Sequence, residues 1–235
     1  MLKIKIRIFL GALALAFAGC ATRDEQHSVR ISIPEQKMMV TDKGVEIARY
    51  DVSTSKFGVG DRPGSFATPL GTMEIAKKIG DGQPSGMKFH GRRPTGEIVK
   101  PDAPGRDPIV SRILWLRGLQ FQNARAFDRA IYIHGTAEES KIGTPASYGC
   151  IRMRSRDVIQ FYDIVGLGAR VEISMDPLPK SAMDVRAAEA AAKVSAAAAK
   201  AAPSTPPAPS ASEQAPAART PSSPIIGALP PPHQG

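Results

Sequence analysis

One histidine and one cysteine in the second half of the chain have the types and spacing that covalent catalysis uses. His134 lies in Ile133-His134-Gly135-Thr136, and Cys150 follows after 15 residues, at the end of Ser147-Tyr148-Gly149-Cys150. A cysteine nucleophile needs a nearby imidazole that takes its proton and stabilises the thiolate at neutral pH. Gly149 allows the backbone to bend, so that consecutive N–H groups converge on one point, as an oxyanion requires. From these residues alone, a structural histidine beside an inert cysteine is the alternative.

Short β-rich runs separated by turn residues indicate which elements position this pair. Strands are predicted over residues 29–33, 37–41, 45–53, 72–76, 109–116, 130–133 and 169–174. A helix is predicted from Ser155, as its N-terminal cap, through Val165, with Gly166 as its stop. The segment 80–108 is rich in Gly and Pro and is expected to form a long, functional loop. This pattern predicts a mainly β, sandwich-like domain with one or two short helices.

The N-terminus carries the pattern of an export signal. Lys3, Lys5 and Arg7 precede the uncharged apolar run 8–19, and Cys20 follows directly. Residues 1–19 therefore read as a signal peptide, because the apolar run is too short to span a bilayer stably. The ending Phe17-Ala18-Gly19-Cys20 resembles a bacterial lipobox, although Phe17 is less usual there than leucine. We expect Cys20 to carry a lipid and 20–27 to be the anchor linker; an ordinary cleaved signal is the alternative.

Composition excludes several classes of protein. The chain of 235 residues has only two cysteines and a net charge of +9, so it is neither a disulfide scaffold nor a polytopic membrane protein. If Cys20 is acylated, Cys150 has no partner in an oxidising compartment and must be buried or used. The spread charge and few aromatics do not predict nucleic-acid binding. Residues 28–179 suffice for one core, and the Ala/Pro/Ser-rich tail 180–235 is predicted to be disordered.

The segment around the pair resembles the signature of the L,D-transpeptidase catalytic domain family, the YkuD family. That signature has a histidine, roughly fifteen residues, and then Ser/Thr-His-Gly-Cys. The resemblance extends to the predicted hairpins in 31–53, to Thr68-Pro69-Leu70-Gly71, and to Ile151-Arg152-Met153 after the cysteine. It covers most of residues 29–174. The visible departure is Tyr148, where the family often has histidine.

The family resemblance implies a set of site residues. Cys150 would be the nucleophile, and His134 would be its base, oriented through the Gly135 carbonyl. The backbone N–H groups of Tyr148, Gly149 and Cys150 would form the oxyanion hole.

Three further residues are candidates at the edge of this site. Arg152 would hold a substrate carboxylate or carbonyl, because a guanidinium offers several donors in one plane. Ser147 would support the turn with its hydroxyl. His90 is a candidate for lining the substrate cleft, although the sequence favours an ordinary surface residue of the segment 80–108.

The resemblance implies a thioester acyl-enzyme, formed from a peptidoglycan stem peptide and resolved by an amine acceptor. No metal and no cofactor follow from it, and no local ligand pair supports a zinc site at His90, His134 and Cys150. Hydrolysis of the same bonds, or a non-catalytic wall-binding lipoprotein, are the alternatives. We expect a monomeric, membrane-anchored periplasmic protein, and Ala21 after the lipidated cysteine favours the outer membrane.

Overall fold

The computed structural model describes residues 23–105, 107–181, 185 and 188–195. The chain divides into two compact units, Met1–Val185 and Arg186–Gly235. In the second unit, residues 188–195 are helical. The predicted signal peptide 1–19, Cys20 and most of the predicted disordered tail lie outside the described residues. Within the described part, no helix is long and apolar enough to cross a membrane.

The first unit is mainly β, as predicted. Its strands are β1 (His27–Ser32), β2 (Lys37–Asp42), β3 (Val45–Asp51), β4 (Gly71–Ile79), β5 (Met87–His90), β6 (Arg93–Ile98), β7 (Ile109–Gly118), β8 (Tyr132–Thr136), β9 (Ile151–Met153) and β10 (Arg170–Ser174). The helix α1 (Ser155–Ile164) and the two short 3-10 turns η1 (Phe121–Asn123) and η2 (Glu139–Lys141) complete it.

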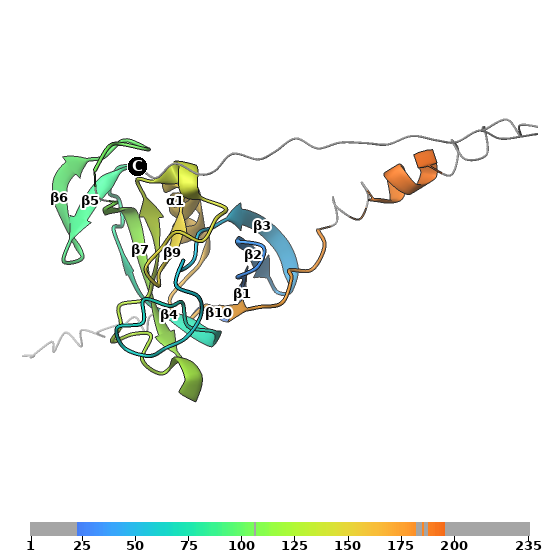
Figure 1. Cartoon of the computed structure of the whole chain (residues 1–235), viewed down its shortest axis with the longest axis horizontal. Helices are drawn as coiled ribbons and strands as arrows, with labels where there is room; N and C mark the ends of the chain where they lie inside the picture. Colours follow the sequence, from blue (N-terminus) through green and yellow to red (C-terminus); the bar gives the residue numbers. More distant parts are fainter. Residues whose placement is uncertain (1–22, 106, 182–184, 186–187, 196–235) are drawn as a thin grey trace, which may run out of the picture. The chain divides into compact units, whose positions relative to one another are not determined.

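Within this part of the chain, the ten strands form one curled sheet, which supplies both layers of the predicted sandwich. The order is β3-β2-β1-β10-β4-β7-β5-β6, and β8 pairs with both β7 and β9. The main core lies inside the curl, where α1 packs Val158, Phe161 and Tyr162 among the buried side chains of most of the strands. Figure 1 shows β1–β3 and the β5–β6 hairpin on opposite sides of α1. A smaller apolar cluster around Tyr132 covers the other face of β7 and β8.

The prediction of one long loop over residues 80–108 is wrong for the middle of this segment. Residues 87–98 form the β5–β6 hairpin, and β5 also pairs with β7 at Phe89↔Ile109. Gly91 and Arg92 both have positive φ, which suits a tight two-residue hairpin turn. Every residue of β6 is exposed, so the strand has none of the apolar alternation by which sequence reveals strands.

Two local details differ from the sequence expectations. The N-cap position of α1 is Arg154 rather than Ser155, and the Ser155 N–H is bonded instead by Glu139 Oε1 at 2.7 Å. The expected linker 20–27 is partly folded, because the Asp24 N–H donates to the Leu167 carbonyl and the Asp24 carboxylate accepts from Gly166. The chain is therefore held against the domain from Asp24 onward.

Candidate active site

The pairing of β8 with β9 brings His134 and Cys150 onto one face of the sheet. The two strands are parallel, with Ile133 opposite Ile151 and His134 opposite Arg152. Successive side chains alternate between faces, so Ile133 and Ile151 enter the main core while His134 and Arg152 point to the other side. Cys150, two residues before Arg152, shares that side and packs against the Tyr132 cluster. His134 and Cys150 are thus diagonal neighbours on adjacent strands.

The backbone of β8 and its approach hold the thiol directly. The Tyr132 N–H donates to Cys150 Sγ at 3.4 Å, and the thiol contacts the Ala130 carbonyl oxygen, also at 3.4 Å. Cys150 is half-buried and unpaired. These contacts fix the sulfur between an N–H donor and a carbonyl acceptor, so the sulfur has one position rather than several.

The imidazole of His134 is buried and oriented by its own strand. Nδ1 lies 2.8 Å from the Gly135 carbonyl oxygen, the contact that the family resemblance implies. Because a carbonyl only accepts hydrogen bonds, Nδ1 carries the proton in this arrangement. Nε2 is then left with a lone pair, which is the arrangement a general base needs.

Burial favours the neutral form of both groups. It lowers the pKa of His134 to about 4, although the Gly135 carbonyl and Asp107 act in the opposite direction; Arg152 lowers it further. Burial also raises the pKa of Cys150 to about 11, against the Tyr132 N–H, Arg152 and Arg129, which favour the thiolate. Burial therefore favours the neutral thiol and the neutral imidazole over the thiolate–imidazolium pair.

The turn before the nucleophile is held by Ser147 and Thr68. Ser147 Oγ donates to the Cys150 carbonyl at 2.5 Å and accepts from the Gly149 N–H at 3.2 Å, while Thr68 Oγ1 donates to the Gly149 carbonyl at 3.0 Å. Gly149 has a φ of +115°, and a Cβ there would lie 3.2 Å from the Ala67 carbonyl oxygen. Only glycine fits this position without strain.

These bonds correct the predicted oxyanion hole. The Gly149 N–H is already used by Ser147, so it is not a free donor. Among the described residues, no hydrogen bond is assigned to the backbone N–H of Tyr148 or of Cys150. The geometry therefore leaves these two N–H groups as the candidate donors, and Ser147 acts on the turn rather than on substrate.

Arg152 is held by two carboxylates. Its Nε lies 3.1 Å from Asp107 Oδ2 and one terminal nitrogen lies 2.9 Å from Glu138 Oε2. The side chain is largely buried, so this charge sits beside His134 with acids already around it. The predicted contact with a substrate carboxylate stays a prediction, and it would have to use the donors that these acids leave open.

Asp107 is the site residue that sequence reasoning missed. Besides Arg152, its Oδ1 accepts from Thr136 Oγ1 at 2.7 Å and from the N–H groups of Ala137 and Glu138 at 2.9 and 3.3 Å. It thereby ties the end of β8 to the segment before β7. Its only sequence signal is a carboxylate in a Pro-rich stretch, which is too common to single out.

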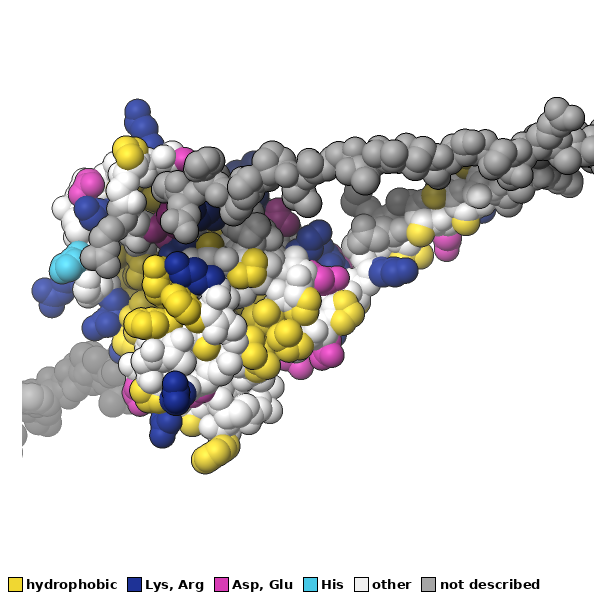
Figure 2. Space-filling model, viewed as in Figure 1, with side chains coloured by type: hydrophobic (Ala, Val, Ile, Leu, Met, Phe, Trp, Pro, Cys, Tyr) yellow, Lys and Arg dark blue, Asp and Glu magenta, His cyan; other side chains and the backbone are white. Residues whose placement is uncertain are grey.

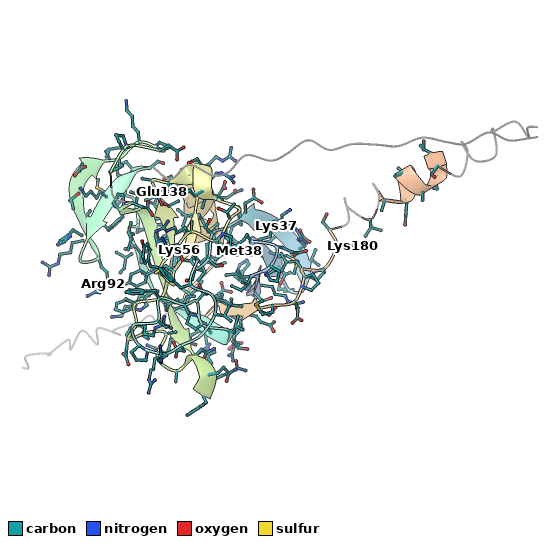
Figure 3. All side chains as sticks on the ribbon, viewed as in Figure 1. Lys37, Met38, Lys56, Arg92, Glu138 and Lys180 are labelled. Carbon is teal, nitrogen blue, oxygen red and sulfur yellow. The ribbon has the colours of Figure 1, made fainter. Side chains whose placement is uncertain are left out.

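Tyr148 and His90 lie around the pair rather than within it. The Tyr148 ring is 56% exposed and packs with Phe57 and Phe66, and Lys56 Nζ donates to its hydroxyl at 3.2 Å. Figure 2 shows hydrophobic side chains gathered beside basic ones on this face, and Figure 3 labels Lys56 there. Exposed His90 lines a cavity of about 740 Å³ whose wall also includes Asp107. The described residues thus place His90 in a hollow that reaches the Asp107 network.

Comparison with known proteins shows the family of this domain. The profile of the L,D-transpeptidase catalytic domain family, YkuD, matches residues 26–173. The chain belongs to this L,D-transpeptidase family. Two curated relatives are L,D-transpeptidase-family proteins: YkuD of Bacillus licheniformis is 52% identical over 42 residues, 18% of this chain and 26% of its own. YqjB of Bacillus subtilis is 40% identical over 55 residues, which are 23% of this chain and 31% of its own. The matches thus span about a quarter to a third of these relatives.

Solved L,D-transpeptidase structures are similar over a larger share of the chain. The enzyme of Mycobacterium smegmatis is 16% identical, with a TM-score of 0.42, over 63% of this chain and 58% of its own. L,D-transpeptidase 3 of Mycobacterium tuberculosis, solved with a faropenem-derived adduct, is 18% identical, with a TM-score of 0.41, over 63% and 60%.

Proposed function

We propose that this L,D-transpeptidase domain uses Cys150 as its nucleophile and acts on peptidoglycan stem peptides. The observation that supports this most directly is the placement of the thiol and the His134 imidazole on one face of adjacent strands. Nε2 is free to take a proton because Nδ1 is committed to the Gly135 carbonyl. A domain that only binds the wall has no need for this arrangement.

The reaction follows from these positions. His134 Nε2 takes the thiol proton as Cys150 Sγ attacks the carbonyl carbon of the amide between the third and fourth stem residues. The N–H groups of Tyr148 and Cys150 donate to the developing oxyanion. The imidazolium then gives its proton to the leaving amine, and a thioester remains on the sulfur. An amine acceptor attacks the thioester and loses a proton to His134. The C–S bond then breaks, the new amide leaves, and the imidazolium returns the proton to Cys150 Sγ.

The resting ionisation state suits a proton transfer that is concerted with attack. A neutral imidazole can accept a proton, and a neutral thiol can lose one. The charge pair is created only when a carbonyl is present to take the sulfur's electrons. Asp107, with its carboxylate near His134, favours the imidazolium at that moment.

We also propose that the protein is exported and anchored by a lipid on Cys20, in the periplasm. The apolar leader and the lipobox-like ending support this. Incorporation of labelled fatty acid into the full-length protein, lost in Cys20→Ala, tests it. Release of wild-type protein from washed membranes without detergent would refute the anchor.

Incubation of the protein with purified muropeptides, followed by mass spectrometry, tests the activity. Cross-linked products are expected from wild-type and none from Cys150→Ala. Met175→Ala, at an exposed position, serves as the matched control and should act like wild-type. Trimmed peptides without cross-links would instead indicate that water is the acceptor. Products from Cys150→Ala at the wild-type rate would refute the proposed nucleophile.

A further inference from the structure

The segment after β7 presents an apolar side chain to solvent at one end of the domain. We call residues 119–125 the β7 tip. Phe121 is 98% exposed and Leu119 is 38% exposed. In Figure 2 a hydrophobic side chain projects at the lower end of the molecule, where Figure 1 places the end of β7. Isolated exposed apolar residues are ordinary, so the surroundings of Phe121 must decide whether it has a function.

The β7 tip is held rigidly. Asn123 is fully buried, and its Nδ2 donates to the carbonyls of Leu70 and Thr72, both at 3.0 Å. Its Oδ1 accepts from the Gln120 N–H at 2.9 Å, and Gln120 Oε1 accepts from the Thr72 N–H at 2.7 Å. Phe121 lies between these two pinned residues. These bonds fix the backbone of the turn on both sides of Phe121, so the turn holds this position at the surface in advance of any contact.

The surface around Phe121 carries three arginines and two aspartates, a small basic excess. Two hollows flank the ring, of about 390 and 600 Å³, and exposed Arg62, Arg117 and Arg125 line them. Asp61 lines one hollow and exposed Asp128 lines the other. The Asp61 carboxylate is bound by Arg129 and by the Arg125 N–H, and Arg117 is paired with Glu74. An exposed aromatic side chain flanked by arginines is suited to the boundary between anionic headgroups and acyl chains.

The N-terminus reaches the same end of the domain. Arg23 and Arg117 both contact the carboxylate of Glu74, on β4. Only two residues lie between Arg23 and Cys20, so the anchored sulfur is at most about 10 Å along the chain from Arg23. Phe121 is four residues beyond Arg117, at most about 14 Å away by the same measure. The proposed lipid and Phe121 are therefore each within about 14 Å of chain from one of the two arginines that meet at Glu74.

We propose that the β7 tip is a membrane-docking element, in which Phe121 enters the interfacial layer of the bilayer while Arg62, Arg117 and Arg125 contact anionic phospholipid headgroups. This inference rests on the lipid anchor of the proposed function. A single lipid tethers a protein without fixing its orientation, and a second contact beside it supplies the orientation.

Docking would set the height of the active site above the bilayer. The chain runs from the β7 tip to Ala130, whose carbonyl contacts Cys150 Sγ at 3.4 Å. The nine residues from Gln122 to Ala130, which follow Phe121, span at most about 30 Å. A docked β7 tip would thus hold the nucleophile at a constant short distance from the membrane surface, rather than let it swing on the anchor.

Depth-dependent fluorescence quenching tests the inference on full-length, lipidated protein. Phe121→Trp is reconstituted in vesicles of phosphatidylethanolamine with a minority of phosphatidylglycerol, with or without brominated acyl chains. Ile98→Trp is the matched control, because Ile98 is 50% exposed and lies on β6, whose hairpin pairs with the opposite end of β7. Native Trp115 contributes the same background to both variants and to wild-type.

We expect brominated lipid to quench the added emission of Phe121→Trp by at least twofold and to leave that of Ile98→Trp unchanged. Equal quenching of both variants by brominated lipid, on protein that floats with the vesicles, would overturn the docking element but not the lipid anchor. Protein that does not float would overturn both membrane proposals. The muropeptide assay in solution is independent of these outcomes, so a failure of the proposed enzyme activity would be recognised separately.

Discussion

The thiol of Cys150 is expected to react slowly with alkylating reagents at neutral pH, in spite of the imidazole beside it. Burial raises its pKa to about 11. At pH 7 such a thiol has about 300-fold less thiolate than an exposed cysteine of pKa near 8.5. A more basic thiolate is a better nucleophile, which returns about tenfold of that loss. Iodoacetamide should therefore modify Cys150 roughly 30-fold more slowly than it modifies free cysteine.

The pH dependence of this reaction is the sharper measurement. With the pKa of His134 near 4 and that of Cys150 near 11, a preformed thiolate–imidazolium pair is a minute fraction of the resting enzyme. The alkylation rate should rise nearly tenfold per pH unit between pH 6 and 10. A plateau from pH 5 to 9 would mean that the ion pair already exists, and our account of burial at this site would be wrong.

Replacing the base separates resting ionisation from catalysis. In His134→Gln, the alkylation rate at pH 7 should stay within about threefold of wild-type, because the imidazole does not ionise the resting thiol. Acylation by a stem peptide or a carbapenem should fall by about 10²–10⁴-fold, since the proton acceptor of the transition state is lost. Intact-mass spectrometry follows both adducts on the same protein. Parallel losses in the two reactions would refute the distinction.

Four further outcomes are expected. The pKa of His134 in the folded protein lies below its ordinary value, so on acidification the unfolded chain takes up the proton first. Wild-type should therefore lose about 3 kcal/mol of unfolding free energy between pH 7 and 4, measured by urea denaturation. His134→Gln should not show this loss. Ser147→Ala loosens the turn at Gly149 and should slow carbapenem acylation about tenfold, at a stability cost of about 1–2 kcal/mol, with unchanged kinetics as the contrary result. Tyr148→Phe loses one exposed hydrogen bond and should acylate within about tenfold of wild-type; inactivity would make the phenol a catalytic group. Asp107→Asn removes a carboxylate that favours the imidazolium, so acylation should fall about tenfold or more while iodoacetamide alkylation is unchanged, and equal losses in both rates would point to a folding defect.

Local patterns in the sequence carried the predictions that the structure confirms. β-branched and apolar runs between turn residues predict the strands β1 to β3, and an apolar face that ends at a glycine predicts α1. Both patterns arise from the period with which each element buries one face, so they can be read without knowing what the face is buried against. The sequence did not predict the β5–β6 hairpin, because β6 has no buried face and so no apolar alternation.

The identity of the candidate nucleophile and base was likewise open to sequence reasoning, since residue type and spacing carry that signal. Their arrangement depended on contacts between segments far apart in the chain. The parallel register of β8 and β9 sets His134 opposite Arg152. Asp107, 45 residues before Arg152, supplies the neutralising carboxylate.

By itself, then, the sequence determined the family and the mainly β class and indicated His134 and Cys150 as the candidate pair, because each of these depends on residue types at short range. Only the tertiary structure decided that burial disfavours the charged form of both groups, that Ser147 takes the Gly149 N–H, and that Arg23 and Arg117 meet at Glu74. Burial, hydrogen-bond competition and proximity are properties of packed neighbours. Those neighbours come from segments that are distant in sequence, so no local pattern can specify them.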